Sequence, residues 1–208
     1  MSELKKTEAA DNDTKDRLLA AAKDLFFSKD FNSVTTDMIA HAGSMSKSTI
    51  YKFYRSKDDL FAAVINAESE RFGADALESF ETYNDFRMSL QTYGENLLEF
   101  ISLPSSCRFE RMMMCHADEH TDTVRLFFDN AYLAAEERVT ELIELAKKSG
   151  HIETKFDSRR LADFLLSMWR GREHVARQYA LDQSPRSQIA FHVGECIEVL
   201  FGPDEAKS

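Results

Sequence analysis

The stretch that decides the fold covers residues 35–64 and reads TTDMIAHAGSMSKSTIYKFYRSKDDLFAAV. Thr35 is a residue type that favours a helix N-cap, so a short helix is predicted from Thr36 to about Ala42. Gly43-Ser44 then breaks the pattern, and Ser46 can cap a second short helix that reaches about Phe53. Two short helices joined by a tight turn are the outline of a helix-turn-helix unit.

The segments on either side complete this unit. Upstream, a first helix from about Asp13 to Ser28 carries apolar residues at helical spacing, and downstream Ser56 caps a fourth helix that extends to about residue 73. Residues 1–12 are polar and are expected to form a disordered tail. We therefore predict a three-helix DNA-binding domain over residues 13–60, with the fourth helix as a link to the rest of the chain.

The remainder of the chain also indicates helices. The 208 residues include only three prolines and seven glycines, and no segment alternates apolar and polar residues for long enough to predict a sheet. Five longer helices are predicted beyond Gly73, which gives about nine in total. The fold class is all-α, with a larger helical domain over residues 74–203.

Charge is distributed unevenly along the chain. The first 60 residues hold ten Lys/Arg and ten Asp/Glu, so the entire formal net charge of -10 belongs to the remaining 148 residues. Within residues 44–57 there are four basic residues and no acidic one. Because an acidic body repels phosphate, any contact with nucleic acid must be local and close to the amino terminus.

Membrane and export signals are not found in the sequence. No apolar run reaches the roughly 18 residues of a transmembrane helix, and the opening residues MSELKKTEAADND lack the apolar segment of a signal peptide. Cys107, Cys115 and Cys196 are odd in number and widely spaced, which favours free thiols in a reducing compartment. We expect a cytoplasmic protein without a membrane partner.

The helix-turn-helix segment resembles the DNA-binding signature of TetR-family transcriptional regulators over about residues 13–65. The resemblance rests on Thr35, Ile39-Ala40, the run from Ser46 to Tyr51, and Ser56-Lys57. It implies that one group of residues holds the phosphate backbone: Thr35, Thr36, Tyr51 and Lys57. A second group is expected to make base contacts or mixed contacts: Ser46, Lys47, Ser48, Thr49 and Lys52.

The turn departs from the family pattern at one position. The family usually has Ala-Gly immediately before the recognition helix, whereas here Gly43-Ser44 stands there and the glycine comes one residue early. Ser44 is therefore expected to adopt an unusual backbone angle or to donate to a phosphate.

The second domain is similar to that of AcrR/AefR-like regulators, on the segments CRFERMMMCHADEHTDTVRLFFDNA and DSRRLADFLLSMWRG. That resemblance implies a homodimer that represses transcription at a palindromic operator and is released by a small apolar or amphipathic inducer. Met and aromatic residues are candidates to line its pocket, although such residues are more often part of a core: Phe100, Met112, Met113, Phe127, Phe128, Tyr132, Phe164 and Met168. Two apolar stripes predict a dimer interface or, alternatively, an internal core: Leu161, Leu165, Trp169, Ile189, Val193, Cys196 and Leu200.

Two other functions remain open from the sequence. His116, Glu119 and His120 spell H-x-x-E-H, a zinc-peptidase pattern, but no distal third ligand accompanies it. A metal-sensing or redox-sensing regulator would use Cys107, Cys115, His116 and His120. No phosphate-binding glycine loop or G-x-S-x-G motif is present, so neither an enzyme nor a cofactor is predicted.

Overall fold

The structure is a computed structural model that describes residues 2–29, 31–73, 80–115, 121–179 and 186–203. Over these residues the chain is helical and contains no strand, which confirms the all-α prediction. The described residues form ten α-helices, where about nine were predicted for the chain. They are α1 (Ser2–Ser28), α2 (Thr36–Ala42), α3 (Lys47–Phe53), α4 (Lys57–Gly73), α5 (Tyr83–Ile101), α6 (Pro104–Cys115), α7 (Thr121–Phe128), α8 (Ala134–Lys148), α9 (Ser158–Gln178) and α10 (Arg186–Phe201).

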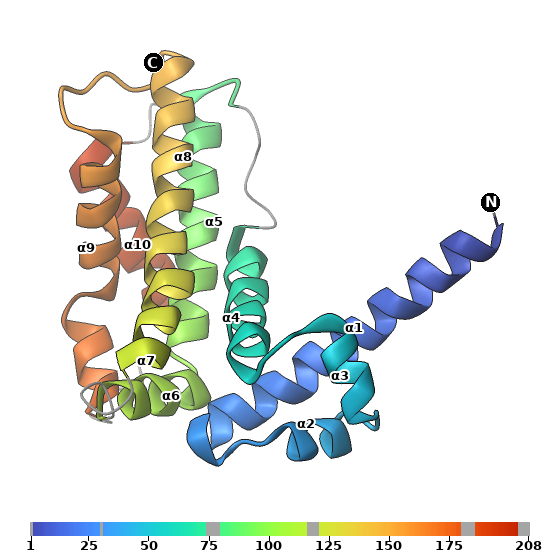
Figure 1. The fold of residues 1–208 in the computed structure, drawn as a ribbon. Helices are drawn as coiled ribbons and strands as arrows, with labels where there is room; N and C mark the ends of the chain where they lie inside the picture. Colours follow the sequence, from blue (N-terminus) through green and yellow to red (C-terminus); the bar gives the residue numbers. More distant parts are fainter. Residues whose placement is uncertain (1, 30, 74–79, 116–120, 180–185, 204–208) are drawn as a thin grey trace. The chain divides into compact units, whose positions relative to one another are not determined.

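The first helix differs most from its prediction. α1 begins at Ser2, so residues 2–12, which were expected to form a disordered tail, are helical (Figure 1). These residues include Ala, Glu and Lys, which are strong helix formers. They extend a helix that the core already holds, so they need no new nucleation step.

The chain divides into two compact units, each with its own core. Unit 1 comprises residues 1–67 and 108–130, and unit 2 comprises residues 68–107 and 131–208. Residues 108–130 were predicted to belong to the second domain, and in the structure they cluster with unit 1, where the ring of Phe109 packs. Its ring centroid lies 4.6 Å from that of Phe27 and 5.8 Å from that of Phe61, both in unit 1.

The core of unit 1 holds α1, α2, α3 and α4 together. Leu18, Ile39 and Ile50 are buried to 1% exposure or less, one from each of the first three helices. Phe26 of α1 and Phe61 of α4 meet edge to face at 5.3 Å. Because each helix buries its apolar stripe against the others, the polar face of α3 is left at the surface.

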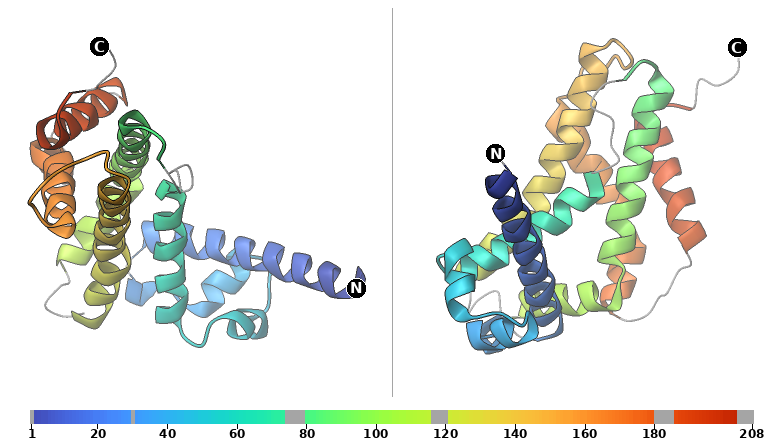
Figure 2. Two further views of the ribbon diagram at one scale, coloured as in Figure 1. Left: turned by 90° about the horizontal axis from the view of Figure 1, so that it is seen from above. Right: turned by 90° about the vertical axis from the view of Figure 1, so that its right-hand side faces the viewer.

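Unit 2 is built around α5, α8, α9 and α10. α5 contacts α8 and α10, and α9 packs against both of those helices, an arrangement that Figures 1 and 2 show from three directions. Trp169 and Tyr93 are almost fully buried at its centre, with ring centroids 6.4 Å apart. α5 starts with a capping box in which Thr82 and Asp85 exchange hydrogen bonds.

Two helices of this region are irregular. A π-helical segment, Asp129–Leu133, stands between α7 and α8. α9 is kinked at Gly171, whose φ of 42° and ψ of -159° are not helical. Close to this kink, His192 Nε2 of α10 lies 3.0 Å from Met168 O and 3.1 Å from Trp169 O.

Candidate nucleic-acid interface

The turn between α2 and α3 closes through a Schellman arrangement. The N–H of Met45 donates to Ala40 O at 2.9 Å, and the N–H of Ser44 donates to His41 O at 3.2 Å. This arrangement requires a left-handed residue at its centre, a position usually occupied by glycine. Ser44 has a φ of 50° and is the non-glycine residue with positive φ in the described chain, which confirms the unusual backbone angle predicted for it.

The amino-terminal end of α3 is held by a network of hydroxyl groups. Ser46 is the N-cap, and its Oγ accepts a hydrogen bond from the N–H of Thr49 at 3.1 Å. The hydroxyl oxygens of Ser48 and Thr49 lie 2.7 and 2.8 Å from Ser46 Oγ. The three side chains predicted to meet DNA are therefore gathered at one helix end, where N–H groups and the helix dipole favour an anion.

Both lysines of α3 form ion pairs with neighbouring helices. Lys47 Nζ lies 2.8 Å from Asp37 Oδ2 of α2, and this hydrogen bond raises the pKa of Lys47. Lys52 Nζ lies 2.6 and 2.7 Å from the two carboxylate oxygens of Asp11, on α1. Sequence reasoning missed both carboxylates, because they lie 10 and 41 residues away and no local pattern connects them to α3.

The other predicted DNA contacts have different surroundings. Thr35 caps α2, with its Oγ1 accepting from the N–H of Met38 at 3.2 Å, and Thr36 is the first residue of that helix. Tyr51 is 53% exposed on α3, so its ring and hydroxyl are accessible. Ile50 between these polar residues is 1% exposed, as expected for the side chain that anchors the helix to the core.

Lys57, another predicted phosphate contact, makes hydrogen bonds within the protein at the start of α4. Its Nζ donates to Phe31 O at 2.7 Å and to Val34 O at 3.1 Å, and it lies 4.1 Å from the centroid of the Phe31 ring. These contacts tie the start of α4 to the short 3₁₀ helix Phe31–Ser33. Lys57 therefore holds the loop between α1 and α2 to the start of α4, and its contact with phosphate stays a prediction.

The predicted ligand-binding residues divide between the two units. Met112, Met113, Phe127 and Phe128 belong to unit 1, whereas Phe100, Tyr132, Phe164 and Met168 belong to unit 2. Their environments differ as well: Met113 is 5% exposed, whereas Phe128 is 48% exposed. Within unit 2, the guanidinium of Arg170 lies 4.1 Å from the ring centroid of Tyr132. A pocket shared by these residues stays a prediction.

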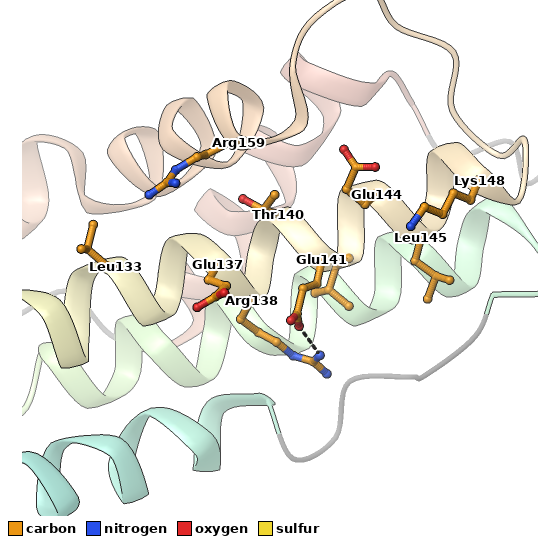
Figure 3. Close-up of a pocket in the computed structure, with 10 residues that line it drawn as sticks. Leu133, Glu137, Arg138, Thr140, Glu141, Glu144, Leu145, Lys148 and Arg159 are labelled. Atoms are coloured by element: carbon orange, nitrogen blue, oxygen red, sulfur yellow. Dashed lines mark hydrogen bonds and ion pairs between the residues drawn. The ribbon is translucent and has the colours of Figure 1, made fainter.

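A cavity of about 750 Å³ lies along α8 in unit 2 (Figure 3). Its lining includes three acidic and three basic side chains, and none of the eight predicted ligand residues contributes to it. Arg138 and Glu141 pair within it at 3.0 Å. A lining of this charge does not match the apolar pocket predicted from the sequence. The lining residues are Leu133, Glu137, Arg138, Thr140, Glu141, Leu142, Glu144, Leu145, Lys148 and Arg159.

The residues assigned to a dimer interface are corrected by their burial. Six of the seven are at most 5% exposed within the single chain and belong to the core of unit 2: Leu161, Leu165, Trp169, Ile189, Val193 and Cys196. Leu200 is partly buried against the same core. The stripes therefore join α9 to α10 inside one chain. Apolar side chains that do face outward from these helices include Phe164, Phe191 and Val199.

The residues of the metal and redox alternatives do not form a site in the described part of the chain. Cys107 is buried and its Sγ lies 3.2 Å from Ile101 O, whereas Cys115 is exposed. Burial raises the pKa of Cys196 to about 11, so its thiol stays protonated at neutral pH. His116, Glu119 and His120 lie outside the described residues. No cluster of three or more His, Cys, Asp or Glu suited to a metal ion is found among the residues described.

Comparison with known proteins identifies both parts of the chain. Residues 18–64 match the family model of bacterial regulatory proteins of the TetR family. Residues 88–202, more than half of the chain, match the AefR-like transcriptional repressor C-terminal domain. The chain belongs to the TetR family of transcriptional regulators. Neither match corresponds to an enzyme family.

Individual TetR-family relatives are distant. The chain is 28% identical over 89 residues to the transcriptional regulator QacR of Staphylococcus aureus, covering 38% of this chain and 47% of QacR. It is 34% identical over 98 residues to the uncharacterized regulator YdeS of Bacillus subtilis, covering 47% of each. The alignments thus span about half the length of these curated relatives.

Solved structures of the family share the fold. The flavonoid-responsive regulator FrrA superimposes with a TM-score of 0.66 at 23% identity, covering 91% of this chain and 95% of FrrA. A TetR transcriptional regulator from Agrobacterium tumefaciens gives a TM-score of 0.71 at 19% identity, covering 92% and 96%. No helix in the described part of this TetR-family chain is long and apolar enough to cross a membrane.

Proposed function

We propose that this TetR-family chain is a ligand-responsive repressor that binds a palindromic DNA operator as a homodimer in the cytoplasm. The observation that carries the DNA-binding part is the exposed face of α3. Ser48, Tyr51 and Lys52 are exposed there, while Ile50 fixes the helix to the core. In a helix-turn-helix unit the second helix enters the major groove and its early residues meet base edges and phosphates.

The chemistry of this face is suited to DNA. Hydroxyl and ammonium groups donate directly to phosphate oxygens, and a lysine can also donate to guanine O6 and N7. Ser46, Lys47 and Thr49 stand in the first turn of α3 or cap it, close to the positive end of its dipole. By the same reasoning we infer that Thr35 and Thr36, at the start of α2, contact the phosphate backbone.

Binding to the chain's own promoter region tests this proposal. Fluorescence anisotropy with that duplex and with a random duplex is to be measured between 50 and 200 mM salt, conditions over which phosphate-dependent binding weakens steeply. We expect preference for the promoter DNA, and a loss of about tenfold or more for a Lys47→Ala, Tyr51→Ala double variant. Equal affinity for both duplexes, undiminished in the double variant, would refute DNA recognition by α3.

Release by a small molecule rests on the similarity to ligand-responsive relatives. FrrA is named as flavonoid-responsive, and its fold resembles that of this chain over 91% of this chain's length. Met and aromatic side chains adapt to apolar and aromatic ligands. We therefore propose a planar aromatic or amphipathic inducer, which favours a conformation that misfits the operator. In the anisotropy assay an added flavonoid should dissociate the complex, and unchanged binding with flavonoids and amphipathic compounds alike contradicts this part of the proposal.

A further inference from the structure

The DNA-facing helix carries its own counter-ions. α3 contains two lysines, and each pairs with a carboxylate from a different neighbouring helix: Lys47 with Asp37 of α2, and Lys52 with Asp11 of α1. Nζ–Oδ distances of 2.8 and 2.6 Å make both pairs direct hydrogen-bonded contacts. Lys52 meets both oxygens of Asp11, although the two residues are 41 apart in sequence. As Figure 1 shows, α1 continues past α3 toward its amino terminus.

Fold stability alone does not explain these pairs. The four side chains are between 41% and 74% exposed, and ion pairs at that exposure typically contribute little to folding. The core of unit 1 holds α3 independently through Ile50, which is 1% exposed. These carboxylates therefore affect the binding of a charged ligand at α3 more than they affect the stability of the fold.

A phosphate that approaches α3 meets these carboxylates as rivals. A lysine ammonium that donates to Asp11 or Asp37 must exchange that acceptor for a phosphate oxygen. After the exchange the carboxylate remains tethered on α1 or α2 within a few ångströms of the bound phosphate, where like charges repel. DNA binding then requires breaking two internal ion pairs and placing two anions beside the DNA backbone.

We propose that Asp11 and Asp37 act as built-in competitors of DNA phosphate for Lys52 and Lys47, and so set the affinity and the salt dependence of DNA binding. The inference rests on the proposed DNA-binding function. It assigns a role in that function to Asp37 and to Asp11 of α1. This competition weakens the binding of the free protein to polyanions in general. The remaining contacts of α3 then contribute a larger share of the discrimination between DNA sequences.

Neutral variants of the two carboxylates test the inference, and Asp13 supplies a matched control. Asp13 lies on α1 two residues from Asp11, but it pairs with Arg17 at 3.6 Å and touches no lysine of α3. Asp11→Asn, Asp37→Asn and Asp13→Asn make the same change in formal charge. They are to be compared on promoter and random duplexes across 50–200 mM salt, with circular dichroism to verify that helicity is retained.

The expected result separates contact from overall charge. Asp11→Asn and Asp37→Asn should each tighten binding to both duplexes on the order of three- to tenfold at low salt. Each should also steepen the slope of log K against log salt by up to about one, because one more phosphate is effectively neutralised. Asp13→Asn should give a clearly smaller change. In a Lys52→Gln background, the gain from Asp11→Asn should become clearly smaller, because only the direct repulsion between this carboxylate and phosphate is then left to remove.

Heparin-agarose gives a readout that does not depend on an operator. The Asp11→Asn and Asp37→Asn variants should elute at higher salt than Asp13→Asn and the unmodified chain, even if promoter DNA is not preferred. If promoter DNA is not preferred over random DNA, the proposed function is refuted, but the competition between carboxylates and polyanions can still be measured on heparin. Equal elution and equal DNA affinity of Asp11→Asn and Asp13→Asn, or a gain that is undiminished with Lys52→Gln, would overturn the inference.

Discussion

At the scale of single residues, Ser44 shows how a local rule is broken at the point where two functional helices meet. The Schellman arrangement needs a positive φ, and Ser44 adopts 50° although its Cβ disfavours that region. The neighbouring Gly43 has a φ of -81°, which any residue can adopt. The residue that must be left-handed is thus the serine, while the glycine occupies a position with an ordinary φ. The turn carries strain as a result.

Ser44→Gly is therefore predicted to stabilise unit 1. Relief of the left-handed serine should raise the free energy of unfolding by about 1 kcal/mol, since glycine adopts positive φ without steric cost. Urea unfolding followed by circular dichroism measures it. The same change at Ser48, inside α3, is the control and should lower stability by about 0.5 kcal/mol through the weaker helix propensity of glycine. Equal shifts at both positions would contradict strain at Ser44.

Residue contacts also mark the limit of sequence-based prediction. The bounds of α2 and the capping roles of Thr35 and Ser46 were predictable, because caps and turns depend on neighbours within about four residues. The partners of Lys47, Lys52 and Lys57 were not, because each is a carboxylate or carbonyl brought close by tertiary packing. Composition identified the acid-free segment 44–57, but it could not reveal carboxylates supplied from outside it.

At the scale of helices, glycine determines how closely three elements of unit 2 approach. A Cβ on Gly94 of α5 would lie 2.8 Å from Trp169 Cζ2 of α9 and 2.8 Å from Val193 Cγ1 of α10. Trp169 and Val193 are both buried to 1% or less, so neither can move into solvent. The apolar stripes of α9 and α10 looked equally suited to a dimer interface in sequence, because periodicity shows which face is apolar but not what covers it.

Gly94→Ala is predicted to destabilise unit 2 by about 1–3 kcal/mol through overpacking. Unfolding in urea, followed by the fluorescence of Trp169, the one tryptophan of the chain, reports on the site directly. Gly194→Ala on α10 is the matched control, because its added Cβ would meet only the flexible end of Gln91 at 3.2 Å. That control should be neutral or stabilise by up to about 1 kcal/mol through helix propensity. A Gly94→Ala chain as stable as the control would contradict the close packing.

At the scale of the whole molecule, α9 and α10 bury one face and expose another. Their inward stripes fill the core of unit 2, while Phe164, Phe191 and Val199 remain exposed by 37%, 68% and 74%. Exposed apolar residues on adjacent helices are typical of an interaction surface. A two-fold dimer through this surface would present two copies of α3, and a symmetric protein binds a palindromic operator with half-sites about one helical turn, or a multiple of it, apart.

Phe191→Glu combined with Val199→Glu is therefore predicted to convert the proposed dimer to a monomer, because four carboxylates would face one another across a two-fold interface. Light scattering after size exclusion at micromolar concentration measures the mass, which should fall by half from a dimeric unmodified chain. Phe156→Glu, on an exposed residue between α8 and α9, is the control and should remain dimeric. A double variant that stays dimeric would place the interface elsewhere, and a monomeric unmodified chain would exclude the dimer itself. Operator affinity should fall when dimerisation is lost, since a single α3 then engages one half-site and the gain in effective concentration from the second is lost.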